Sequence, residues 1–172
     1  MTVVIPTWAL TLAYGLHMLA TVVWVGGLAG MAVLVLPAAR KTLSPETYLS
    51  FLGSLQERLQ RVGWMCLIVL IATGMFQMSA SPNYQGFLAI TNSWALAILI
   101  KHIAVGGMVL VSAYLTWGLA PELQRLALRR MKNGLVNEEE AEKLRRREQI
   151  LYWLNLGLAI GVLALTAWAR SI

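Results

Sequence analysis

The chain has 172 residues, of which 58% are hydrophobic and 13% are charged, and its formal net charge is +6. Soluble domains average about 45–50% apolar and about 25% charged residues, so this composition excludes a disordered chain and an ordinary soluble enzyme. The length allows one domain, and we expect residues 1–172 to form a single all-α integral membrane protein.

Four apolar stretches are each long enough to cross a hydrocarbon core of about 30 Å as a helix. They cover about residues 7–36, 62–79, 94–120 and 150–168. The string Ser44-Pro45-Glu46 is typical of a helix N-cap and first turn, so the second helix is expected to begin before its apolar part. Pro121 is expected to kink the third helix, and Asn133-Gly134 to end it.

The basic residues predict the orientation of the helices. All fourteen except Lys101 and Arg170 lie in the connections that follow the first and third spans, whereas residues 80–93 carry no charge. The positive-inside rule makes those two connections cytoplasmic, so both termini face outward from a plasma (inner) membrane. The basic residues therefore indicate how the helices are oriented in the membrane, with lipid as the expected partner. They do not indicate nucleic-acid binding. The mixed-charge run from Glu138 to Arg146 is expected to be a solvated helix extension.

Three ionisable side chains lie inside the predicted spans, namely His17, Lys101 and His102. The acidic residues, all glutamate, lie outside the spans, which excludes paired-carboxylate catalysis and carboxylate proton relays within the membrane. Counted from Trp8 and Trp94, His17 lies about 14 Å and His102 about 12 Å below the outer surface, at about 1.5 Å per residue.

Two imidazoles at one depth, on two helices that run in the same direction, suit a b-type haem or a linear copper(I) site. The strings Trp8-Ala9-Leu10 and Trp94-Ala95-Leu96 precede the two histidines at similar spacing, which indicates a repeat of two parallel helical hairpins. The alternative is a structural role, in which each histidine hydrogen-bonds a neighbouring helix.

Four more residues are expected near the histidines. Met75 reaches the same depth on the second helix, and its thioether suits copper(I). Lys101 either snorkels to the outer surface or anchors a haem propionate or an anionic substrate. Thr21 is placed to orient the His17 imidazole, and Gly106 leaves room beyond His102 for a broad planar ligand.

Three parts of the sequence resemble the copper-resistance D (CopD) family of small bacterial membrane proteins. They are Leu16-His17-Met18-Leu19-Ala20-Thr21-Val22-Val23-Trp24-Val25-Gly26-Gly27, then Arg58-Leu59-Gln60-Arg61-Val62 leading to Ala72-Thr73-Gly74, and Trp94 through Lys101. The resemblance implies a copper-linked role, such as moving or sensing copper at the plasma membrane. The chain is also similar to HemJ-type protoporphyrinogen oxidases, whose first-span histidine and third-span lysine map onto His17 and Lys101.

We therefore expect an integral membrane four-helix bundle with both termini outside and cytoplasmic helical extensions. The favoured function is transmembrane electron transfer by a b-type haem that His17 and His102 ligate. The alternatives are copper(I) transport or copper resistance, a HemJ-like oxidase, and a structural membrane scaffold. Besides lipid, the expected partners are an external redox protein or copper donor and a second copy of the chain, for which Gly26-x-x-x-Gly30 and Gly157-x-x-x-Gly161 are suitable.

Overall fold

A computed structural model describes residues 6–82, 84, 86, 92–133 and 138–171. The elements in chain order are α1 (Thr7–Ala29), the π-helical segment η1 (Gly30–Val35), α2 (Leu36–Thr42), α3 (Pro45–Ser79), α4 (Ser93–Ala113), the π-helical segment η2 (Tyr114–Leu119), α5 (Ala120–Asn133) and α6 (Glu138–Ser171). In this part of the chain, four helices are long and apolar enough to cross a membrane. The expected all-α fold with four spans is confirmed.

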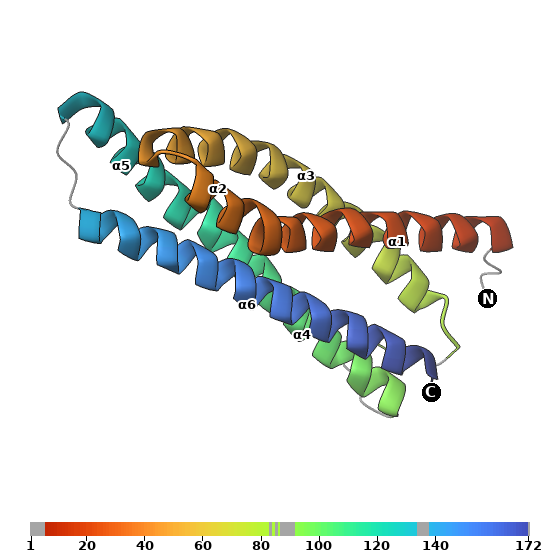
Figure 1. Cartoon of the computed structure of the whole chain (residues 1–172). Helices are drawn as coiled ribbons and strands as arrows, with labels where there is room; N and C mark the ends of the chain where they lie inside the picture. Colours follow the sequence, from red (N-terminus) through yellow and green to blue (C-terminus); the bar gives the residue numbers. More distant parts are fainter. Residues whose placement is uncertain (1–5, 83, 85, 87–91, 134–137, 172) are drawn as a thin grey trace.

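The four long helices lie lengthwise beside one another, and both termini lie at the same end of the bundle (Figure 1). We call this the outer end and the opposite one the inner end, following the positive-inside rule. α1 packs chiefly against α3, and α4 against α6. Each half of the chain is therefore a helical hairpin, and α1 and α4 run in the same direction, as the repeat predicts.

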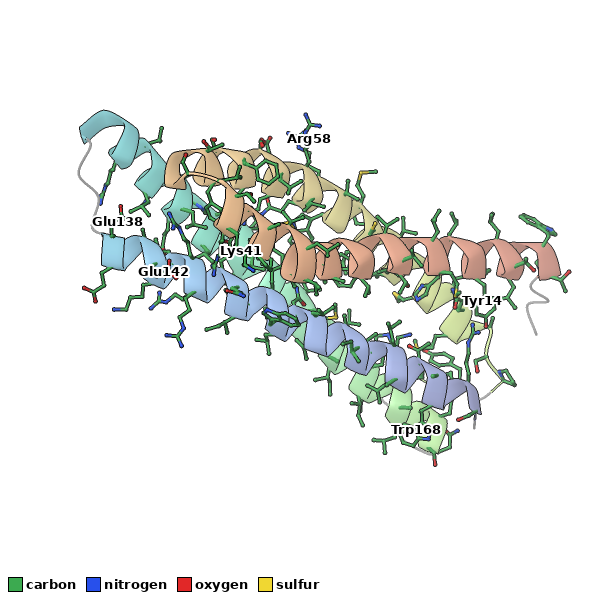
Figure 2. All side chains as sticks on the ribbon, viewed as in Figure 1. Tyr14, Lys41, Arg58, Glu138, Glu142 and Trp168 are labelled. Atoms are coloured by element: carbon green, nitrogen blue, oxygen red, sulfur yellow. The ribbon has the colours of Figure 1, made fainter. Side chains whose placement is uncertain are left out.

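Apolar side chains cover the outside of the bundle. In the most apolar stretch of each long helix, only 28%, 11%, 11% and 22% of the residues are buried, in chain order. The labelled charged residues Lys41, Glu138 and Glu142 lie toward the inner end, and Trp168 lies toward the outer end (Figure 2). Because so much exposed apolar surface is stable only against lipid, the chain is a multi-pass membrane protein.

Each π-helical segment ends just before a proline. The N–H groups of Leu36 and Ala120 bond to the carbonyl oxygens five residues earlier, which is the π-helical pattern. Pro37 and Pro121 follow directly and have no N–H, so an ordinary helical hydrogen bond is missing and the backbone widens. Pro121 is the proline at which a kink was expected, and Pro37 holds the same place in the first hairpin.

Most of the buried core lies in the inner half of the bundle, where the side chains include Met31, Leu36, Tyr48 and Leu119. In the outer half, the buried residues of α1 and α4 are the alanines Ala13, Ala20 and Ala97. Small side chains fill less space between helices than leucines do. The two histidines therefore lie in the less bulky half of the bundle.

Helix α3 begins at the predicted cap. The Ser44 hydroxyl oxygen accepts a hydrogen bond from the Thr47 N–H at 3.3 Å, and Pro45 takes the first helical position. At the other predicted boundary, α5 ends at Asn133, while Gly134 lies outside the described residues.

Replacing Ser44 by alanine is expected to lower the free energy of unfolding by about 1 kcal/mol, because the Thr47 N–H loses its acceptor. Thermal unfolding of the purified protein in detergent measures this effect. Ser50→Ala is the matched control, since the exposed Ser50 hydroxyl donates to a carbonyl within α3 and caps nothing. Equal unfolding temperatures for the two variants would show that the cap does not stabilise the fold.

Candidate functional site

His17 is half-buried on α1 and faces α3. Its Nδ1 lies 2.9 Å from the Thr73 hydroxyl oxygen, and that hydroxyl donates to the Val69 carbonyl oxygen at 2.6 Å. A hydroxyl has one proton to donate, so the Thr73 oxygen accepts from Nδ1–H of His17. The imidazole therefore carries its proton on Nδ1 and its lone pair on Nε2. Metal-binding histidines are commonly held in this way through the second nitrogen.

His102 has the same tautomer by a different contact. Its Nδ1 lies 2.7 Å from the carbonyl oxygen of Ile98, one turn earlier on α4. Because a carbonyl oxygen only accepts hydrogen bonds, Nδ1 of His102 must carry the proton. The lone pair is again on Nε2, which makes Nε2 the nitrogen that a metal would bind.

The two histidines lie on helices that belong to different hairpins, since α1 packs chiefly against α3 and α4 chiefly against α6. His17 is ten residues after the start of α1, and His102 is nine residues after the start of α4. At about 1.5 Å per residue, these positions are about 15 Å and about 14 Å along two helices that run in the same direction. Nδ1 of His17 is held by α3, whereas Nδ1 of His102 bonds to a carbonyl oxygen of its own helix.

The other predicted site residues have varied surroundings. Thr21 donates to the main-chain carbonyl oxygen of His17 at 2.7 Å, and Thr73 rather than Thr21 bonds the imidazole. The Met75 side chain is 55% exposed. Gly106 is exposed, and nothing lies within 4 Å of where its Cβ would be. Lys101 is partly buried and close enough for its charge to act on His17.

Two further residues lie near His17, and of these Arg170 was not identified from the sequence. A Cβ on Gly74 of α3 would lie 3.3 Å from Cε1 of His17, so glycine at this position gives the ring its space. Arg170 of α6 places its guanidinium carbon 5.4 Å from the centre of the Tyr14 ring, and its charge also acts on His17. His17 therefore lies in a basic environment near the outer end.

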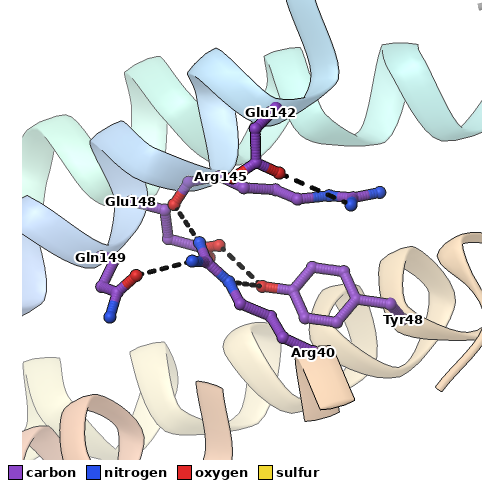
Figure 3. A network of polar contacts seen from close by, with 6 residues as sticks. All are labelled: Arg40, Tyr48, Glu142, Arg145, Glu148 and Gln149. Atoms are coloured by element: carbon purple, nitrogen blue, oxygen red, sulfur yellow. Dashed lines mark hydrogen bonds and ion pairs between the residues drawn. The ribbon is translucent and has the colours of Figure 1, made fainter. Parts of the chain in front are cut away.

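A second polar cluster lies toward the inner end around Glu148 of α6, which is completely buried (Figure 3). Tyr48 of α3 donates its hydroxyl to one carboxylate oxygen at 3.5 Å, and the Gln56 amide donates to the other. Burial and the nearby carboxylate raise the pKa of the Tyr48 hydroxyl, so Tyr48 stays protonated and able to donate.

Arg40 of α2 joins this cluster to α6. Its guanidinium donates to the Tyr48 hydroxyl at 3.4 Å, to the Gln149 side-chain oxygen at 2.6 Å and to the Arg145 carbonyl oxygen. The Arg145 guanidinium lies 5.1 Å from the centre of the Tyr48 ring. The cluster thus ties α2, α3 and α6 together by charge-assisted hydrogen bonds.

Glu148 lies two residues beyond the run from Glu138 to Arg146, for which a solvated helix extension is expected. Glu138, Glu139 and Glu140 in the first turn are exposed, as expected, but Glu148 is not. The buried residues of α6 include Ala141, Leu144, Glu148, Tyr152, Asn155 and Ala159, which follow each other at three- and four-residue intervals. This helical spacing could have indicated from the sequence that Glu148 is buried. The three arginines directly before Glu148 instead suggested an exposed segment.

Metal-ligating side chains are sparse in the part of the chain that the structure describes. No three His, Cys or Glu side chains gather there in a way that would hold a metal ion. Structural zinc sites need four such ligands, and catalytic ones need three. Axial haem ligation and linear copper(I) each need only two imidazoles.

Comparison with known proteins identifies a family for most of the chain. The family model described as copper resistance protein D matches residues 54–169, which is well over half of the chain. No curated protein sequence and no solved structure matches the chain. The matched range includes Thr73, His102 and Glu148, whereas His17 precedes it.

Proposed function

The chain belongs to the copper resistance protein D family, and we propose that it handles copper by binding copper(I) between Nε2 of His17 and Nε2 of His102. The observation that carries this proposal is the hydrogen bond at Nδ1 of each ring. Both bonds direct the lone pair to Nε2, and imidazole is a suitable ligand for copper.

The charges near His17 favour copper(I) over copper(II). Lys101 and Arg170 both act on His17, and the described glutamates lie toward the other end of the helices or on the connections. Coulomb repulsion from two cationic side chains is twice as large for a divalent ion as for a monovalent one. A site in these surroundings therefore holds a monovalent ion more readily.

Met75 fits a transient role in this proposal. More than half of its side chain is exposed at the outer half of α3, so we assign it to the entry of copper and not to the final pair of ligands. A thioether is a soft ligand that exchanges copper(I) readily with imidazole. Copper would then arrive at the outer end from an external donor.

Haem is the second candidate, because the same pair of anchored imidazoles suits the axial positions of a b-type haem. Lys101 would lie near a propionate in that case. The family match points to copper. Gly106 leaves open space beside α4, but that space does not indicate which ligand would fill it.

The metal content and absorption spectrum of the purified protein test the proposal. We expect a single copper ion per chain that survives dialysis, and no Soret band. A Soret band that His17→Ala and His102→Ala each abolish would establish haem instead. A protein that retains neither copper nor haem when loaded with each would contradict both candidates.

Replacing Thr73 by valine is expected to weaken copper(I) binding by about 10-fold, because the His17 ring loses the acceptor that fixes its tautomer. Competition with a copper(I) chelator measures the affinity. Thr21→Val is the matched control, since the Thr21 hydroxyl bonds the main chain of His17 and not its ring. Equal losses in the two variants would argue against a role for the imidazole hydrogen bond.

A further inference from the structure

A pocket of about 270 Å³ lies at the inner end of the bundle, where residues of α2, α3 and α6 meet. We call it the inner pocket, and the residues that line it are Arg40, Leu43, Tyr48, Glu142 and Arg145. Three of these five side chains are charged, and two of the three are arginines. The Glu142 side chain is 67% exposed, so the pocket reaches the surface of the protein on this side. The proposed copper site uses none of these residues.

The two arginines of the inner pocket lie at the depth of lipid headgroups. Arg40 is four residues beyond Leu36, where the first apolar stretch ends, and Arg145 is five residues before Ile150, where the fourth one begins. At about 1.5 Å per residue, these positions are about 6 Å and about 8 Å outside the hydrocarbon core. The headgroup layer is about 5–8 Å thick on each side of that core. The inner pocket is therefore at the level of the phosphate groups of the inner leaflet.

Arg145 is a cation with unused hydrogen-bond donors. Its side chain is 15% exposed, and its Nη1 forms an ion pair with the exposed Glu142 carboxylate at 4.0 Å. Nε and Nη2, which form one edge of the guanidinium, are buried and have no hydrogen-bond partner among the described residues. The guanidinium carbon lies 5.1 Å from the centre of the Tyr48 ring. Because a buried cation with unpaired N–H groups is costly, an anion in the adjoining pocket would stabilise this arrangement.

The neighbouring acidic groups balance the two arginines only in part. Arg40 donates its hydrogen bonds to three neutral oxygens, so it brings its charge to the pocket without a hydrogen-bonded anion (Figure 3). The buried Glu148 carboxylate lies near both guanidinium groups, and its oxygens accept hydrogen bonds from two side chains of α3. Glu142 is exposed, and solvent weakens the attraction of an exposed carboxylate. The pocket therefore has an excess of positive charge that suits an anionic ligand.

We propose that the inner pocket binds the phosphate group of an anionic phospholipid from the inner leaflet. Arginine suits this ligand, because a guanidinium pairs with two phosphate oxygens at once. Basic pockets between membrane-spanning helices on the cytoplasmic side are places where anionic headgroups bind. The exposed Arg146 and Arg147 of the same helix add to the positive charge of this surface. The binding does not depend on the proposed copper site, which lies in the outer half of the bundle.

Native mass spectrometry of the purified protein in a neutral detergent, titrated with phosphatidylglycerol or phosphatidylcholine, tests the proposal. We expect one phosphatidylglycerol to bind several-fold more tightly than phosphatidylcholine, and Arg145→Gln to weaken its binding by at least about 10-fold. Arg146→Gln is the matched control, because it removes the same charge from an exposed neighbour that does not line the pocket. Its effect is expected to be at most about 3-fold. Equal affinities for the two lipids, or equal losses in the two variants, would overturn the proposal.

A second variant separates lipid binding from a purely structural role of Arg145 and leaves the arginine in place. Glu142→Gln removes the carboxylate that pairs with Arg145 at the pocket, so it is expected to tighten phosphatidylglycerol binding several-fold. Glu140→Gln removes an exposed carboxylate from the same helix away from the pocket, and a smaller gain is expected. A Glu142→Gln variant that gains no more affinity than Glu140→Gln would contradict a phosphate beside Arg145.

Inorganic phosphate distinguishes a lipid headgroup from a free phosphate as the source of the anion. We expect millimolar inorganic phosphate to leave phosphatidylglycerol bound, because the acyl chains keep the headgroup at a high effective concentration beside the pocket. Inorganic phosphate that displaces the lipid from wild type, and that itself binds Arg145→Gln less tightly, would assign the pocket to a free phosphate and overturn the lipid proposal.

Discussion

Replacing Arg40 by alanine is expected to lower the free energy of unfolding by about 3 kcal/mol. Arg40 donates hydrogen bonds to three groups on two helices, namely the Tyr48 hydroxyl, the Gln149 side chain and the Arg145 carbonyl. Without the guanidinium, these groups lose their donor and the buried Glu148 loses a nearby cation. A buried charge left without compensation is among the largest destabilising effects known for single substitutions.

Thermal unfolding in detergent compares Arg40→Ala with Arg61→Ala. Arg61 also forms an ion pair, but its side chain is 72% exposed, so its removal is expected to cost less than about 1 kcal/mol. Arg40→Lys keeps the charge but loses the planar guanidinium and its several N–H donors. The stability of this variant is expected to lie between those of wild type and Arg40→Ala. Similar losses for Arg40→Ala and Arg61→Ala would mean that the inner cluster does not hold α2, α3 and α6 together.

Replacing either His17 or His102 by alanine is expected to lower the copper(I) affinity by at least about 100-fold, since loss of a ligand exceeds the effect of losing its hydrogen-bond partner. If both rings bind one ion, the double variant should lose little more than each single variant. Competition with a copper(I) chelator measures all four proteins. Losses that add in the double variant would indicate two separate sites.

The sequence was sufficient for features that depend on one helix at a time. Four spans followed from the lengths of the apolar stretches, and the start of α3 followed from the Ser44 cap, which contacts a residue three positions away. His17 and His102 were identified because an ionisable side chain in an apolar stretch is costly. Their similar depth, which comes from counting residues along α1 and α4, stays a prediction.

Features that depend on packing between helices could not be predicted in this way. Thr73 lies 56 residues from His17 in the sequence, and only the packing of α3 on α1 brings the two side chains together. Glu148 follows three arginines, a pattern typical of a solvated surface, yet Tyr48 and Gln56 of α3 bury its carboxylate. The π-helical segment before Pro37 is a different case, because it follows from a proline that is visible in the sequence.

X-ray absorption at the copper edge of the copper(I)-loaded protein tests whether both histidines bind copper, because it identifies the atoms bound to the metal. We expect two nitrogen ligands with the scattering pattern of imidazole, and no sulfur ligand, since Met75 serves entry only. A spectrum with sulfur ligation alone, or one that is the same in wild type and His102→Ala, would contradict copper binding between His17 and His102.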